Sequence, residues 1–202
     1  MGRRKPICGL AGPGSEGGSM VDSDRQEILS RLQAGSNALK NALSGLDESA
    51  AIHRPTPECW SVVECVEHMI ASETLLLCRL REATPHDQSH EDRAREEKLQ
   101  GLALNRLRRI EAPEPVLPAG KYGSLEQAME GFDSVRRETM RFVEEFGGEF
   151  RSWLTIHPMI TRPLNCYEML LLIALHPMRH SIQIAEIRAG LLPHIDARRT
   201  AP

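Results

Sequence analysis

The pattern of apolar and polar residues predicts four long helices. The first covers residues 22–46, where apolar side chains recur at helical spacing. They are Ile28, Leu29, Leu32, Leu39, Ala42, Leu43 and Leu46. Asp22 or Ser23 can cap this helix, because a short polar side chain accepts a hydrogen bond from the first turn.

The second helix is expected from Ser61 to about Ala83, and Ser61 and Glu64 have the spacing of a capping box. Its apolar stripe consists of Val62, Val66, Met69, Leu76 and Leu80. His68 lies off the centre of this stripe. The third helix begins after Ser124, with Gln127 completing a second capping box, and ends at the glycine pair 147–148.

The fourth helix is expected from its cap at Asn165 to Gly190. One broad side carries Met169, Leu172, Ile173, His176, His180, Gln183, Ile184 and Ile187. Pro177 costs about 3 kcal/mol in a helix interior. One alternative makes His176 an N-cap and Pro177 the first helical residue. The good helix formers before it favour a single kinked helix instead.

The remaining segments are predicted to be connections. Residues 86–100 are polar throughout and indicate a solvated loop or an exposed helical extension. A short helix is expected over 102–110, and Pro and Gly indicate loops over 47–60 and 111–123. With no credible strand pair, the prediction is an all-α four-helix bundle whose long crossover connections permit a topology other than up-and-down. The bundle would span 21–192, between a disordered tail over 1–20 and a C-terminal tail over 193–202.

Composition argues against nucleic acid and membrane as partners. The net charge is −3 and only 4% of residues are aromatic, whereas nucleic-acid binding needs excess Lys and Arg or stacking rings. The longest apolar run, 169–175, is too short to cross a bilayer. Five cysteines without a CxxC pair favour reduced thiols, and the basic N-terminus lacks the apolar stretch of a signal peptide. We therefore expect a cytoplasmic protein whose folded part starts near Met20.

Two histidines, His176 and His180, are spaced for one face of a helix. Each needs a polar partner in an apolar bundle, and a divalent metal would satisfy both. Spacing alone leaves a metal pair and two hydrogen-bonded core histidines equally open. Pro177 excludes HExxH protease chemistry, because it occupies the position of the catalytic Glu.

A third ligand must come from another segment, and His68 is the candidate. Three histidines with open coordination positions would form a catalytic type of metal site. His157 could approach from a loop, although an ordinary loop role is favoured. Gln183 could orient a ligand or be a satisfied polar residue. Cys65 could approach the metal, although a small core residue is favoured, and capping accounts for Glu64.

Two stretches together resemble a known family. WSVVECVEHM, followed about a hundred residues later by ALHPMRHSIQIAEIRAG, is similar to the DinB-like superfamily. The resemblance covers roughly 22–192 and implies a four-helix bundle with an unusual connection order, often a homodimer. It also implies a divalent metal bound by His68, His176 and His180, in a family that includes thiol transferases and isomerases.

These observations lead to a hypothesis of a metal-dependent enzyme with a small-molecule substrate. The metal would be Zn, Ni or Fe, and the reaction could be an S-transfer that uses a low-molecular-weight thiol. The alternatives are a metal-dependent hydrolase and a non-catalytic metal-binding or interaction bundle. A DNA-damage factor, suggested only by the family name, conflicts with the charge balance.

Overall fold

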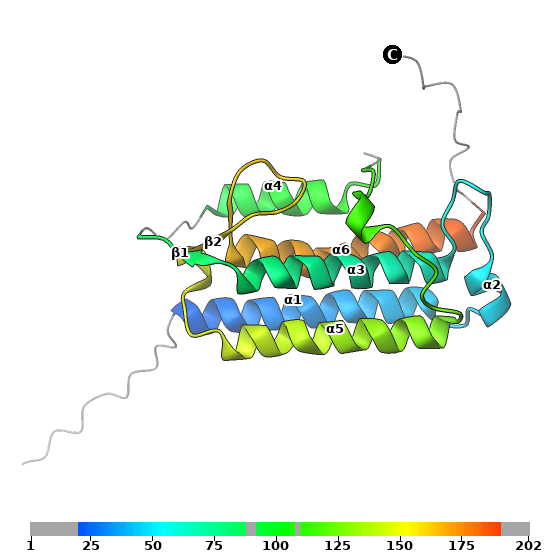
Figure 1. Ribbon diagram of the computed structural model, residues 1–202, viewed down its shortest axis with the longest axis horizontal. Helices are drawn as coiled ribbons and strands as arrows, with labels where there is room; N and C mark the ends of the chain where they lie inside the picture. The colour runs from blue at the N-terminus through cyan, green and yellow to red at the C-terminus, as the bar shows by residue number, and fades with distance from the viewer. Residues whose placement is uncertain (1–19, 88–91, 108–109, 191–202) are drawn as a thin grey trace, which may run out of the picture.

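The computed structural model describes residues 20–87, 92–107 and 110–190. The tails predicted over 1–20 and 193–202 therefore lie outside the described residues, apart from Met20. Four long helices lie side by side in this structure, as Figure 1 shows. They are α1 (Met20–Leu43), α3 (Val62–Arg81), α5 (Leu125–Glu145) and α6 (Cys166–Arg188). The predicted four-helix bundle is confirmed.

The bundle does not alternate simply up and down. Near the start of α1, Arg25 donates to the carbonyls of Val143 and Phe146 at the end of α5, so these helices are antiparallel. Near the end of α6, Arg188 donates to the carbonyl of Ala42 at the end of α1, so α1 and α6 run the same way. In Figure 1, α3 runs with α5 and opposite to α1 and α6. The long crossover connections are what allow this order.

The helix caps follow the local sequence closely. Ser61 with Glu64, and Asn165 with Glu168, form complete capping boxes at the starts of α3 and α6. At α5 only half of the predicted box forms. The Ser124 side chain accepts from the backbone of the third residue, but the side chain of Gln127 reaches Gly123 instead.

Several predicted boundaries are wrong. Helix α1 already includes Asp22 and Ser23, so neither caps it. A short helix, α2 (Glu48–Ile52), forms before the prolines of the first connection, with Asp47 as its N-cap. Helix α6 continues through Pro177 as one element, which confirms the single helix.

The charged segment over 86–100 is also not simply solvated. It contains most of α4 (Arg93–Leu104), which packs on α6. Of the short helix expected over 102–110, residues 102–104 are helical as the end of α4, and the other described residues are not helical. Ion pairs explain why a polar sequence docks here. Glu96 is buried against Arg151, and Arg95 donates to Glu168 at 2.7 Å.

The expectation of no strand pair is wrong as well. β1 (Thr84–Pro85), β2 (Trp153–Thr155) and β3 (Leu164–Asn165) form a small antiparallel sheet in that order. Strands of two or three residues are too short for alternation to reveal them. Two short 3₁₀ helices, η1 (Glu114–Val116) and η2 (Phe150–Ser152), lie in the connections.

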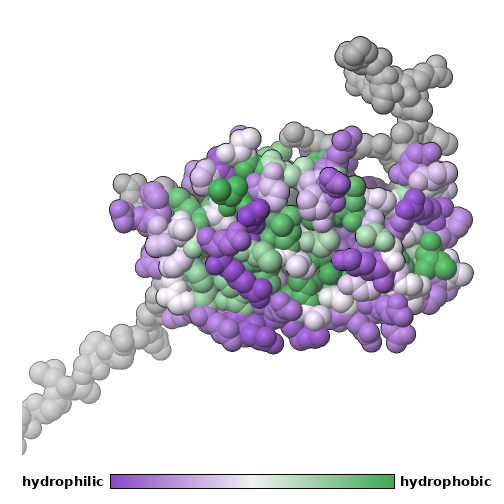
Figure 2. Space-filling view, viewed as in Figure 1, coloured by the Kyte–Doolittle hydropathy of each residue, from purple (hydrophilic) through white to green (hydrophobic). Residues whose placement is uncertain are grey.

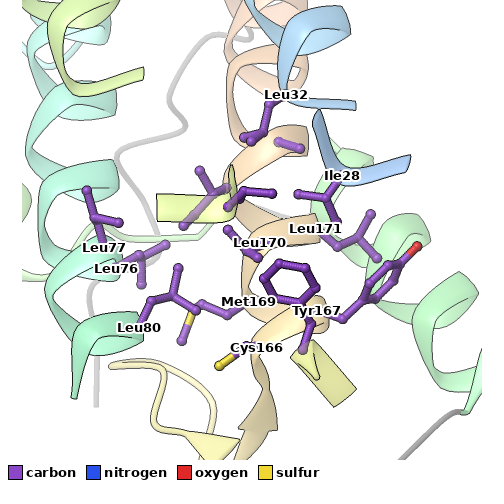
Figure 3. Close-up of a cluster of buried hydrophobic side chains, with 14 of the residues drawn as sticks. Ile28, Leu32, Leu76, Leu77, Leu80, Cys166, Tyr167, Met169, Leu170 and Leu171 are labelled. Carbon is purple, nitrogen blue, oxygen red and sulfur yellow. The ribbon is translucent and has the colours of Figure 1, made fainter. Parts of the chain in front are cut away.

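The core has two parts along the bundle axis. One contains Ile28, Leu32, Leu76, Leu77, Leu80 and the first turns of α6, and Figure 3 shows these side chains converging between the helices. The other contains Leu39, Leu43, Val62, Val66, Phe132 and Ile184. On α6, His176 and His180 fall between the last member of the first cluster, Leu175, and Ile184 of the second.

The surface is mixed. The face in Figure 2 carries apolar residues in groups separated by hydrophilic ones. Among the described helices, none combines the length and the apolar character needed to span a bilayer.

Candidate metal centre

Three histidines from two helices meet inside the bundle. His68 on α3 and His176 and His180 on α6 each offer one ring nitrogen, and these nitrogens lie within 4.8 Å of one another. His68 and His180 are buried, whereas His176 is partly exposed. When the described residues are searched for groups of three or more His, Cys, Asp or Glu side chains that could hold a metal ion, these three histidines are the group found.

The helical spacing produces the pair on α6. His176 and His180 are one turn apart, and their Nε2 atoms face each other at 3.0 Å. The antiparallel neighbour α3 brings His68 between them, with its ring centroid 5.1 Å from that of His176 and 5.0 Å from that of His180. His68 therefore points inward, although the apolar stripe of its helix suggested a position off centre.

A backbone carbonyl sets the tautomer of His68. Its Nδ1 lies 2.8 Å from the carbonyl oxygen of Val116 in η1, and that oxygen can only accept. Nδ1 must therefore carry the hydrogen, which leaves the lone pair on Nε2 for a ligand. A hydrogen bond from the outer ring nitrogen is the usual support of a metal-binding histidine.

The connection between α4 and α5, which contains η1 and the carbonyl of Val116, is held in place by a buried carboxylate. Glu67 on α3 accepts from three successive backbone N–H groups, those of Ala119, Gly120 and Lys121, at 2.9 to 3.1 Å. Gly120 has φ +74°, which an L side chain rarely adopts. Trp60 covers His68 from the other direction, with ring centroids 4.9 Å apart.

Sequence reasoning missed Glu67 and Val116. The sequence offered two signals of this contact: an acidic residue beside a buried helical stripe, and a glycine inside a proline-rich connection. Neither one identifies its partner about fifty residues away, because only the folded chain brings them together.

The surroundings keep the three imidazoles neutral. Burial lowers the pKa of His68, and the hydrogen bond to Val116 opposes this only in part. Burial also places the pKa values of His176 and His180 well below the usual range, and the charged forms of the neighbouring histidines lower them further. A neutral imidazole is the form that binds a metal ion.

Of the other residues that the sequence suggested, Cys65, Glu64 and His157 take no part in the cluster, whereas Gln183 contacts it. Cys65 is packed in the core, and burial raises the pKa of its thiol to about 12, so it stays protonated as a core residue. Glu64 completes the cap of α3 and pairs with Arg54. Nδ1 of His157 accepts from the backbone N–H of Met159 in its loop. Gln183 does reach the site, since its Oε1 lies 2.9 Å from Nδ1 of His180.

The donor set fits a divalent transition metal. Imidazole nitrogens suit Zn, Ni and Fe, and three protein ligands leave a coordination position open for water or substrate. Two of the three histidines have their outer ring nitrogens engaged by oxygen acceptors, as metal-binding histidines usually do.

Comparison with known proteins identifies the family. The model of the DinB superfamily matches residues 31–184, which is most of the chain. The chain belongs to the DinB superfamily. A comparison with curated protein sequences gives no match.

A solved structure has a fold similar to that of this chain. It is similar with a TM-score of 0.52 and 14% sequence identity, over 91% of this chain and 94% of that one. That protein is YfiT from Bacillus subtilis, described as a probable metal-dependent hydrolase with an unusual four-helix bundle topology. At this identity the similarity shows the fold.

Proposed function

We propose that this chain is a divalent-metal-dependent enzyme whose metal is held by His68, His176 and His180. The observation that carries the proposal is the convergence of three neutral imidazole nitrogens within 4.8 Å inside the bundle. Without a metal, the Nε2 atoms of His176 and His180 can share one hydrogen bond at 3.0 Å, and a bound ion would take the place of that bond. Membership of the DinB superfamily and the description of YfiT support the same conclusion.

The protein's own residues would bind the ion and control access to it. A bound divalent ion supplies Lewis acidity and lowers the pKa of a water molecule or thiol beside it. His68 and His180 are the buried ligands, and the partly exposed His176 marks the side from which a small substrate can approach. Trp60 and the apolar neighbours of His68 limit water near the buried ligands.

The proposed reaction is transfer to or from an external thiol. Cys65, one helical turn before His68, is a buried protonated thiol and supplies no nucleophile. A small-molecule thiol would provide the thiolate, its sulfur forming a bond to an electrophilic carbon as the leaving group departs. Hydrolysis is the second candidate, because YfiT is described as a probable hydrolase. A homodimer stays a prediction.

The ligand assignment is tested by metal content. The full chain is purified without a metal-binding tag, and Zn, Ni and Fe are measured in the wild type, His180→Ala and His157→Ala. We expect about one ion per chain in the wild type and in the His157 control, and a large loss in His180→Ala. Equal occupancy in the wild type and His180→Ala would overturn the assignment.

The reaction class is tested by comparing metal-loaded with chelated protein at equal concentration. One series receives several low-molecular-weight thiols with an electrophile, and another receives activated esters and amides in water. Metal-dependent conjugation supports the transferase, and metal-dependent hydrolysis alone supports the hydrolase. If a metal-loaded protein gives neither, and calorimetry detects no thiol binding, the non-catalytic metal-binding bundle takes their place.

A further inference from the structure

Arg106 lies outside the histidine cluster and contacts Gln183, which in turn contacts His180. Arg106 follows α4 in the chain and extends onto α6, where its Nη1 donates to Oε1 of Gln183 at 3.2 Å. Its Nη2 donates to a carboxylate oxygen of Glu186 at 2.6 Å, which anchors the guanidinium. Gln183 and Glu186 are one helical turn apart, so a single side chain spans both.

The chemistry of these groups determines where the hydrogens lie. A guanidinium can only donate, so the atom of Gln183 that faces Arg106 must be the carbonyl oxygen and not the amide nitrogen. The same Oε1 lies 2.9 Å from Nδ1 of His180. Because this oxygen only accepts, Nδ1 must carry the hydrogen, and Nε2 of His180 keeps its lone pair. That lone pair faces Nε2 of His176.

We propose that Arg106 is a positioning residue of the metal centre: it holds the Gln183 amide with its oxygen toward His180 and so keeps His180 in the tautomer whose Nε2 can bind a metal. This inference rests on the proposed metal-binding function. Without Arg106, the Gln183 amide can rotate and present its NH₂ group to Nδ1. The hydrogen of His180 would then move to Nε2, where it blocks the ligand position.

A comparison with His68 shows why His180 needs a residue that fixes the orientation of the Gln183 amide. The tautomer of His68 is set by a backbone carbonyl, which has no donor to present in its place. His180 relies on a side-chain amide, which offers either a donor or an acceptor. A residue that only donates removes this ambiguity, and Arg106 is such a residue.

The test combines a tautomer measurement with a binding measurement on the full chain. In metal-free ¹⁵N-labelled protein, long-range proton–nitrogen correlations report which ring nitrogen of His180 carries the hydrogen. Competition with a chromophoric chelator reports zinc affinity. We expect wild-type His180 to be protonated at Nδ1. In Arg106→Met we expect population of the Nε2-protonated form and roughly tenfold weaker zinc binding, the lower end of the effect of removing an outer-shell partner.

Three further variants separate positioning from folding. Arg106→Lys keeps a donor and should retain most of the Nδ1-protonated form. Arg106→Met combined with Gln183→Glu should restore this form, because a carboxylate has no donor to present. Arg79→Met removes an exposed arginine that pairs with Glu82 and should leave the His180 signal unchanged.

The outcomes distinguish this proposal from the proposed function. If His180 stays protonated at Nδ1 in Arg106→Met, or if the double variant behaves like the single one, the positioning role is wrong even when the wild type binds zinc. If the tautomer changes as expected but the wild type binds no metal, Arg106 does control the tautomer of His180 and it is the metal function that is wrong.

Discussion

At the scale of single residues, burial sets the chemistry of the site. Each of the three histidines has a pKa below its usual range, and burial is the largest cause in every case. A solvated histidine would be partly protonated near pH 6.5 and would repel a cation. The folded chain instead holds three uncharged imidazoles at neutral pH, and this makes it sensitive to acid.

The lowered pKa values of the histidines predict how the stability of the metal-free protein depends on pH. In the unfolded chain, histidine binds a proton below about pH 6.5, but folded His176 and His180 take it up only at lower pH. Between these two pH values the unfolded state therefore binds more protons than the folded state. The free energy of unfolding should therefore fall as pH drops below about 6.5, by up to about 1.4 kcal/mol per pH unit for each histidine.

Denaturant unfolding in a chelator at several pH values measures this slope. A variant with both His176→Gln and His180→Gln should have a shallower slope, whereas the exposed His53→Gln should match the wild type. Parallel slopes for all three proteins would show that these two histidines do not control acid stability.

At the scale of elements, a buried carboxylate holds the connection before α5 on the site. In Glu67→Gln, the three backbone N–H groups lose a charged acceptor, and one of them faces an NH₂ group. Hydrogen bonds to charged groups contribute about 1.5–3 kcal/mol each, so the variant should lose at least one such contribution. Hydrogen exchange at Ala119, Gly120 and Lys121 should accelerate. The exposed Glu130→Gln is the control, and unchanged exchange in Glu67→Gln would contradict the anchoring role.

A close approach between α1 and α6 depends on one glycine. A Cβ placed on Gly35 would overlap the carbonyl oxygen of Ala174, in the turn before Pro177. Gly35→Ala should therefore lower the free energy of unfolding by about 1–3 kcal/mol, the usual cost of overpacking, despite the better helix propensity of alanine.

Another helical glycine provides the matched control. A Cβ on Gly101 of α4 meets no atom of the described residues within 4 Å apart from its chain neighbours and the backbone of its own helix. Gly101→Ala should thus stabilise the protein by about 0.5–1 kcal/mol. Chemical denaturation measures both variants, and a stabilised Gly35→Ala would show that α1 and α6 can separate without penalty.

At the scale of the whole molecule, a buried ion pair joins three helices. Arg136 on α5 donates to Glu73 on α3 at 2.7 Å and to the carbonyl of Leu32 on α1 at 3.0 Å. Both charged side chains are almost fully buried. Burial raises the pKa of Glu73, and the attraction of Arg136 only partly opposes this. The pair thus specifies how these helices meet more than it adds stability.

Removing one partner should be costly, and removing both should not. Arg136→Met leaves a buried carboxylate without its cation and should cost about 3–5 kcal/mol. Arg136→Met with Glu73→Leu replaces the pair by apolar groups and should recover most of this loss. Unfolding curves of the wild type, both single variants and the double variant give the coupling energy. A double variant as unstable as Arg136→Met would contradict the argument.

The sequence by itself determined the features that depend on near neighbours. Apolar spacing predicted the four long helices, and side chains three residues apart predicted the caps at Ser61 and Asn165. The same periodicity placed His176 and His180 together on one helix face. His68 entered as a candidate from its mid-helix position and from the family resemblance, because spacing cannot pair residues a hundred positions apart.

Only the tertiary structure decided the features that depend on distant contacts. Helix α4 docks because the charges of Arg95 and Glu96 find partners on other segments, and the strands are defined by pairing and not by their own sequence. The carbonyl of Val116 and the contact from Arg106 reach the histidines through connections with no periodic pattern. Hydrogen bonds between residues so far apart in the sequence form only when the chain packs, and these bonds set the tautomers of His68 and His180.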